Sequence, residues 1–318
     1  MSGAAERTQL YPLPRHERTG WCESAIGSPV AQRRHTRLNL IRKPISGAKR
    51  TLVVLSLALA GCRAPLPATN PTPETISIRL VTDDASAPLL YELVSHYKPD
   101  RALISWDIEV SDGAAVFEWL REGRAPYAFV GLLPPELGTE SPYWMTPVGL
   151  GGVAFVTHPT NPFQDLSPDQ LRDILQGRVR NWSQLGGADI PLTLITRAPD
   201  SSDGALVQRM VLGDRVVSRD AQLAFSGADV IDRVSAQPGA VGFTSVGHLT
   251  PAVRVLNITG IAPTPEELQK QNYPLRAPIV FAGLRAPGDD PYRAFFAWTQ
   301  SPEGQVIVRT RYGGLPDQ

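Results

Sequence analysis

One short segment places an arginine, two serines and an aspartate ahead of a helix-like run. Arg197 follows an apolar, strand-like run, and Ser201, Ser202 and Asp203 precede the apolar residues 205–212. A strand, a turn and a helix in this order put free backbone N–H groups and the positive end of the helix dipole beside these side chains. A guanidinium adds a fork that suits phosphate or carboxylate. The segment therefore predicts an anion site; the alternative is a serine and aspartate cap with a surface arginine.

Two earlier loops carry polar residues in the same setting. Asp83 and Asp84 lie between the alternating, strand-like residues 76–81 and a helix, and Ser111 and Asp112 lie between the next strand and helix. Repeated strand-helix units predict a parallel sheet with right-handed crossovers. Ligands of such folds bind at the carboxyl ends of the strands, so these loops are candidate site loops. Each aspartate, taken alone, is equally explained as an N-cap.

Strand-like and helix-like runs continue to the carboxyl end. Ser167 and Gln170 form a capping-box signature ahead of a helix that Gly177 ends. The spacing of apolar residues and the length of each run predict further strands at 127–132, 148–158, 239–243, 253–258 and 278–284. They also predict further helices at 229–235, 291–299 and 302–309.

The amino-terminal residues have the organisation of a leader. Lys49 and Arg50 precede the apolar residues 51–59, a run too short to span a membrane stably. The residues Leu59-Ala-Gly-Cys62 that follow resemble the bacterial lipoprotein box, in which the cysteine is lipidated. Residues 1–61 are therefore expected to be a leader with a lipoprotein signal peptide, and residues 62–75 a proline-rich tether. This places the chain in the bacterial cell envelope, anchored through Cys62 and facing the extracytoplasmic side.

Composition excludes several classes of function. The 318 residues carry no net charge, but residues 62–318 hold 21 Lys and Arg against 28 Asp and Glu, which is unlike a nucleic-acid-binding surface. Beyond the leader, the histidines have no metal-ligand spacing, and Cys62 is the single cysteine, so no metal site or intramolecular disulfide is expected. No nucleophile elbow or Walker A pattern occurs. The sequence therefore predicts a non-enzymatic protein without a cofactor.

Several segments, read in order, resemble the periplasmic phosphate-binding proteins of ABC uptake systems. The similar segments are Asp165–Gly177, Asn181–Gly186, Gln237–Phe243, Tyr273–Arg276 and Phe296–Gln305. The resemblance covers about residues 76–316 and implies an α/β fold of two lobes that close on an oxyanion.

The apolar run 148–158 and the return at 239–243 set the expected lobe boundaries. Residues 76–153 and 246–318 are predicted to form lobe 1, and residues 154–245 lobe 2. The ligand cleft is expected between the two lobes.

The resemblance also identifies site residues. Arg197 and Ser201 match the family's arginine motif, whereas its glycine and threonine are replaced by Ser202 and Asp203. Asp83 or Asp84, and Ser111 with Asp112, fall on the two loops that hold phosphate in the family. Carboxylates there would repel a dianion by about 4 kcal/mol for each pair at ~4 Å and an effective dielectric of 20. They would also compete for the N–H groups that phosphate would use.

Two functions remain open at this point. The first is a monomeric, lipid-anchored solute-binding protein that captures phosphate or another small oxyanion weakly for an ABC permease. The second is a degenerate binding-protein fold with a rebuilt acidic cleft, which acts as a sensor or interaction protein or binds a different ligand.

Overall fold

The computed structural model describes residues 74–99, 102–111, 113–131 and 142–316, which all belong to the compact unit Ala68–Gln318. The predicted leader, Cys62 and Asp112 lie outside the described residues, as does all but the end of the predicted tether.

The first described elements form the predicted parallel unit. β1 (Glu74–Asp83) lies between β2 (Ala102–Ser111) and β3 (Tyr127–Val130) and is parallel to both. The crossovers contain α1 (Ala87–His96), which buries its leucines, and α2 (Gly113–Arg121). Because the strands are parallel, the loops after β1 and β2 emerge at the same edge of the sheet.

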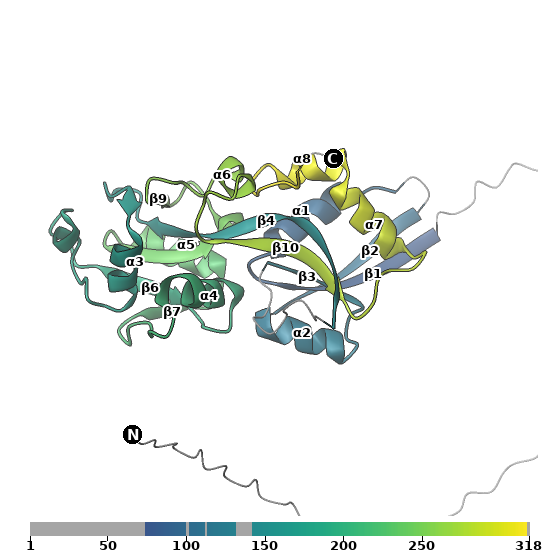
Figure 1. Cartoon of the computed structure of the whole chain (residues 1–318), viewed down its shortest axis with the longest axis horizontal. Coiled ribbons are helices and arrows are strands. Elements are labelled where there is room, and N and C mark those ends of the chain that lie inside the picture. Colours follow the sequence, from purple (N-terminus) through teal and green to yellow (C-terminus); the bar gives the residue numbers. More distant parts are fainter. Residues whose placement is uncertain (1–73, 100–101, 112, 132–141, 317–318) are drawn as a thin grey trace, which may run out of the picture. The chain divides into compact units, whose positions relative to one another are not determined.

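Two long strands connect this unit to the rest of the protein. β10 (Arg276–Gly283) pairs antiparallel with β3 on one side and with β4 (Trp144–Thr157) on the other. The last five residues of β4 then pair antiparallel with β8 (Ala240–Ser245). The two strands therefore run from one group of elements to the other, as Figure 1 shows.

The second group repeats the parallel arrangement. β6 (Thr193–Arg197) is parallel to both β8 and the edge strand β7 (Gln222–Ala224). α4 (Ser202–Val207) follows β6, and α5 (Gly227–Ala236) follows β7. The order of the main sheet is β2-β1-β3-β10-β4-β8-β6-β7, and the fold is the two-lobe α/β architecture that the sequence predicts.

The remaining elements also agree with the predicted pattern, apart from some short ones. They are β5 (Asp165–Leu166), α3 (Pro168–Leu175), β9 (Arg254–Ile258), α6 (Pro265–Gln269), α7 (Pro291–Gln300) and α8 (Pro302–Val308), with 3-10 turns at Trp182–Leu185 and Val246–His248. The capping box of α3 has both of its hydrogen bonds. The sequence did not predict β5, β7, α6 or the two turns.

Two helices begin earlier than predicted. Ser201 accepts a hydrogen bond from the N–H of Gly204, so α4 begins at Ser202 and not at residue 205. Ser226 caps α5 in the same way, so that helix begins at Gly227 and not at residue 229. The run predicted as one helix also changes to a π-helical turn at Gln208–Leu212.

The predicted lobe boundaries remain a prediction, and one strand pairing bears on them. β9 pairs with Phe155–Thr157 of β4 and with β5. This pairing places β9 beside the part of β4 that is predicted to belong to lobe 2.

The largest buried cluster contains hydrophobic residues from both groups of strands, including Phe129, Phe155, Phe243 and Phe281. Among the described ranges, no helix combines the length and apolar character needed to cross a membrane.

Candidate functional site

Arg197 is a buried arginine at the carboxyl end of β6, where its side chain is held by two acceptors. Its exposed fraction is 4%. Nη2 lies 3.0 Å from Oδ2 of Asp84, and Nη1 donates to the carbonyl of Ala224 at 3.1 Å. Nε makes no hydrogen bond to any described residue. The guanidinium therefore has one ion-pair partner, Asp84, and its Nε–H is unused by the described residues.

Asp84 is the acceptor that connects Arg197 to a helix N-terminus. Oδ2 also accepts the N–H of Gly227, the first residue of α5, at 2.8 Å. The Nε2–H of His248 donates to the backbone carbonyl of Asp84 at 2.9 Å and lies 3.6 Å from Oδ2. One carboxylate oxygen thus occupies the positions where an external anion would meet Arg197 and the α5 dipole.

Asp83 is 1% exposed and takes three further donors. Oδ1 accepts the N–H of Ser86 at 2.8 Å, and Oδ2 accepts the Ser202 hydroxyl at 2.5 Å and the N–H of Gly131 at 3.2 Å. Burial raises the pKa of Asp83, and these hydrogen bonds, with the nearby Ser86 hydroxyl, oppose the rise.

Asp203, in the first turn of α4, is the second buried carboxyl, whereas Asp84 is half-buried. Oδ2 accepts the N–H of Ser245 at 3.0 Å. Burial raises its pKa to about 7; Arg197 and the Ser245 N–H lower it, and the carboxylates of Asp84 and Asp83 raise it. A proton therefore occupies this carboxyl for much of the time near neutral pH.

The amino ends of four helices approach these carboxyls. Those of α1, α4 and α5 supply Ser86, Ser202 and Gly227 as donors. At the start of α2, a Cβ on Gly113 would lie 2.4 Å from the Ser202 hydroxyl. Glycine is required there because the start of α2 packs so closely on α4.

The structure brings together most of the residues that the sequence predicts for the site. Asp83, Asp84, Arg197, Ser202 and Asp203 form one cluster, which is buried except for the half-buried Asp84. Ser201 is the cap of α4, with its hydroxyl used by Gly204 N–H and the Ala198 carbonyl. Ser111 ends β2 opposite Asp83 in the strand register. These assignments as ligand contacts remain a prediction, and Asp112 lies outside the described residues.

Five residues of the cluster were not predicted from the sequence, and four of them donate a backbone N–H to a carboxylate. These are Ser86, Gly131, Gly227, Ser245 and His248. A usable signal existed for one of them. Ser226 and Asp229 have N-cap spacing, which would have placed Gly227 at a helix N-terminus.

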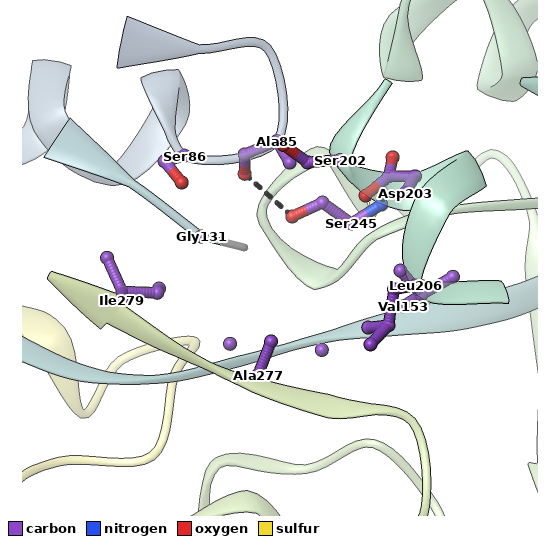
Figure 2. A pocket seen from close by; sticks show the side chains of 12 residues that line it. Ala85, Ser86, Gly131, Val153, Ser202, Asp203, Leu206, Ser245, Ala277 and Ile279 are labelled. Atoms are coloured by element: carbon purple, nitrogen blue, oxygen red, sulfur yellow. Dashed lines mark hydrogen bonds between the residues drawn. The ribbon is translucent and has the colours of Figure 1, made fainter. Parts of the chain in front are cut away.

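A cavity of about 20 Å³ lies beside the cluster, between the helix N-termini and strands β4 and β10. Figure 2 shows its polar residues on one side and its apolar residues on the other. Its volume suits one water-sized group and not a phosphate ion. Within the described part of the chain, no group of three or more His, Cys, Asp or Glu residues could hold a metal ion.

The fold is that of the two-lobe α/β binding proteins, and the polar cluster combines residues from both groups of parallel strands. The chain belongs to the family described as the PBP superfamily domain, which matches residues 127–303.

Two curated relatives are named phosphate-binding proteins. The chain is 30% identical over 170 residues to the phosphate-binding protein PstS of Bacillus subtilis (strain 168), covering 53% of this chain and 56% of that protein. It is 22% identical over 165 residues to PstS of Borreliella burgdorferi, covering 48% and 59%. The chain thus spans about half the length of the curated relatives it matches. A substrate-binding protein from Clostridium perfringens, solved with bound phosphate, has a TM-score of 0.69 at 22% identity and covers 76% of this chain and 100% of its own.

Proposed function

We infer that the chain is the solute-binding protein of an ABC uptake system and that its ligand is phosphate or a related small oxyanion. The relatives support this inference: two are named phosphate-binding proteins, and the Clostridium perfringens structure contains phosphate. These relatives are binding proteins, in agreement with the prediction that the chain is not an enzyme.

The observation that carries the proposal is the environment of Arg197. The guanidinium is buried, and the N–H of Gly227 shares its acceptor on Asp84. A buried cation beside a helix N-terminus favours an anion by charge and by hydrogen bonding. The free Nε of Arg197 leaves a donor for a ligand oxygen.

The aspartates act as internal competitors for these donors. Asp84 holds Nη2 of Arg197 and the N–H of Gly227, and Asp83 holds the three donors from Ser86, Gly131 and Ser202. An oxyanion has to displace a carboxylate and then lie near those that remain. We expect a millimolar dissociation constant, equivalent to about −4 kcal/mol.

The same acidic groups favour a second candidate function. A site in which carboxylates hold most of the donors without a ligand suits a sensor or interaction protein, or a protein for a different ligand. The small cavity supports this alternative, because closure around the cluster leaves no space for phosphate.

The cellular setting is also part of the proposal. Cys62 is the expected lipidation site, and the anchored chain would face the extracytoplasmic side and deliver its ligand to a permease as a monomer. The relatives named as phosphate-binding proteins support an envelope location.

Isothermal titration with phosphate tests the binding function, together with native mass spectrometry for a co-purified small ion. The wild type should bind in the millimolar range, and Arg197→Ala should show no binding because it removes the buried cation. Arg209→Ala is the matched control, because Arg209 is exposed and outside the cluster. No binding by the wild type at millimolar phosphate would favour the second candidate.

A further inference from the structure

We propose that the site takes a phosphorus oxyanion with one methyl-sized carbon substituent, such as methylphosphonate, and that this substituent lies in the cavity beside the helix N-termini. The proposal rests on the oxyanion-binding function and names its substrate class.

The cavity has two chemically different sides. Its polar side is formed by serines and an aspartate from the cluster, Ser86, Ser202, Asp203 and Ser245. Its other side is formed by hydrocarbon side chains from β4, α4 and β10, Val153, Leu206, Ala277 and Ile279. Figure 2 shows these two sets facing each other. A methyl-sized group in the cavity therefore has hydrogen-bonding groups on one side and hydrocarbon side chains on the other.

The apolar side offers no side-chain donor to an oxygen. The N–H of Val153 on this side is already used, because it donates to the carbonyl of Leu275 at 2.9 Å. A phosphate oxygen that points to this side loses its hydrogen bonds to water without replacement. A methyl group has none to lose and gains apolar contact.

The size of the cavity limits the substituent. About 20 Å³ holds one water-sized group, so a methyl fits and a ring does not. The walls are already close-packed: a Cβ on Gly151 would lie 3.0 Å from Cδ1 of Ile279.

Ser86 supplies an independent indication that a ligand group belongs here. Ser86 is 1% exposed, and its hydroxyl has no hydrogen-bond partner among the described residues, although it lies near enough to Asp83 to lower the pKa of that carboxyl. The hydroxyl lines the cavity (Figure 2). A phosphoryl oxygen on the polar side would accept its proton, while Asp203, whose pKa burial raises, can donate to a second oxygen when protonated.

Titration of the full-length chain with three probes tests the proposal. Methylphosphonate should bind at least about tenfold more tightly than phosphate, and phenylphosphonate should not bind. Phosphate binding that equals or exceeds methylphosphonate binding would overturn this proposal and leave the oxyanion function intact. If neither methylphosphonate nor phosphate binds, this proposal and the oxyanion-binding function are both overturned.

A variant pair locates the substituent. Ala277→Ser adds a hydroxyl to the apolar side, where Ala277 is 5% exposed, and should lower the preference for methylphosphonate at least about threefold. Ala252→Ser is the control on an exposed turn and should leave the preference unchanged. An unchanged preference in Ala277→Ser would show that the substituent lies elsewhere and would overturn the assignment.

Discussion

Replacing Asp203 by Asn should stabilise the protein at neutral and alkaline pH. Asp203 is 2% exposed, and the oxygen of an asparagine amide can accept the same N–H of Ser245. The change therefore keeps the hydrogen bond and removes the cost of a buried negative charge beside Asp83 and Asp84.

The magnitude follows from the pKa of Asp203, which burial raises from 3.8 to about 7. Between these two values the folded state holds a proton that the unfolded state has released, so the free energy of unfolding falls as pH rises. One proton corresponds to about 1.4 kcal/mol for each pH unit. The loss is absent below pH ~4, grows up to pH ~7, and reaches about 4 kcal/mol above it.

Urea unfolding of wild type and Asp203→Asn at several values between pH 4 and pH 8 measures this difference directly. The two stabilities should be similar at pH 4, and the variant should be more stable by a few kcal/mol at pH 8. Asp289→Asn, at a side chain that is 96% exposed, should follow the wild type. Parallel curves for wild type and Asp203→Asn would refute the reasoning, because Asp203 would then titrate as it does in the unfolded chain.

Other changes give independent outcomes. Ser202→Ala removes the hydroxyl donor of buried Asp83 and should lower the free energy of unfolding by about 1–3 kcal/mol in urea. Gly227→Ala should lower the melting temperature and weaken oxyanion binding, because its Cβ would lie 2.2 Å from His248 and displace the start of α5; unchanged melting would contradict the tight packing. Cys62→Ser should release the protein from the membrane fraction or leave it unprocessed, and membrane retention equal to the wild type would contradict lipidation.

Local sequence signals predict much of the fold because periodicity and capping act over a few residues. The alternation in residues 76–81 and the capping box at Ser167 both correspond to elements in the structure. The short edge strand β7 is not predicted because three residues are too few to show an alternation of apolar and polar side chains. The start of α5 differs from the prediction because the apolar face begins after the N-cap, so Ser226 marks the first turn of the helix better than the hydrophobic pattern does.

For the site, the sequence predicts which side chains lie at the site better than it predicts their hydrogen-bond partners. Arg197 and the aspartates follow strands, so topology alone places them at one edge. Which aspartate meets Arg197 depends on how the two halves of the chain pack, and the structure identifies Asp84. The N–H of Gly131 and the position of His248 come from tertiary packing, and local patterns carry no information on either.

The central claim is that the protein's own carboxylates hold the donors of its anion site. Titration of Asp84→Ser with phosphate tests it most directly, because this change frees Nη2 of Arg197 and the N–H of Gly227 together. The account predicts at least about tenfold tighter binding than in the wild type, equivalent to about 1.4 kcal/mol. Asp289→Ser provides a control, since the side chain of Asp289 is 96% exposed and pairs with Arg293. Weaker binding by Asp84→Ser, or submicromolar binding by the wild type, would contradict the claim, because Asp84 would then be a ligand contact and not a competitor.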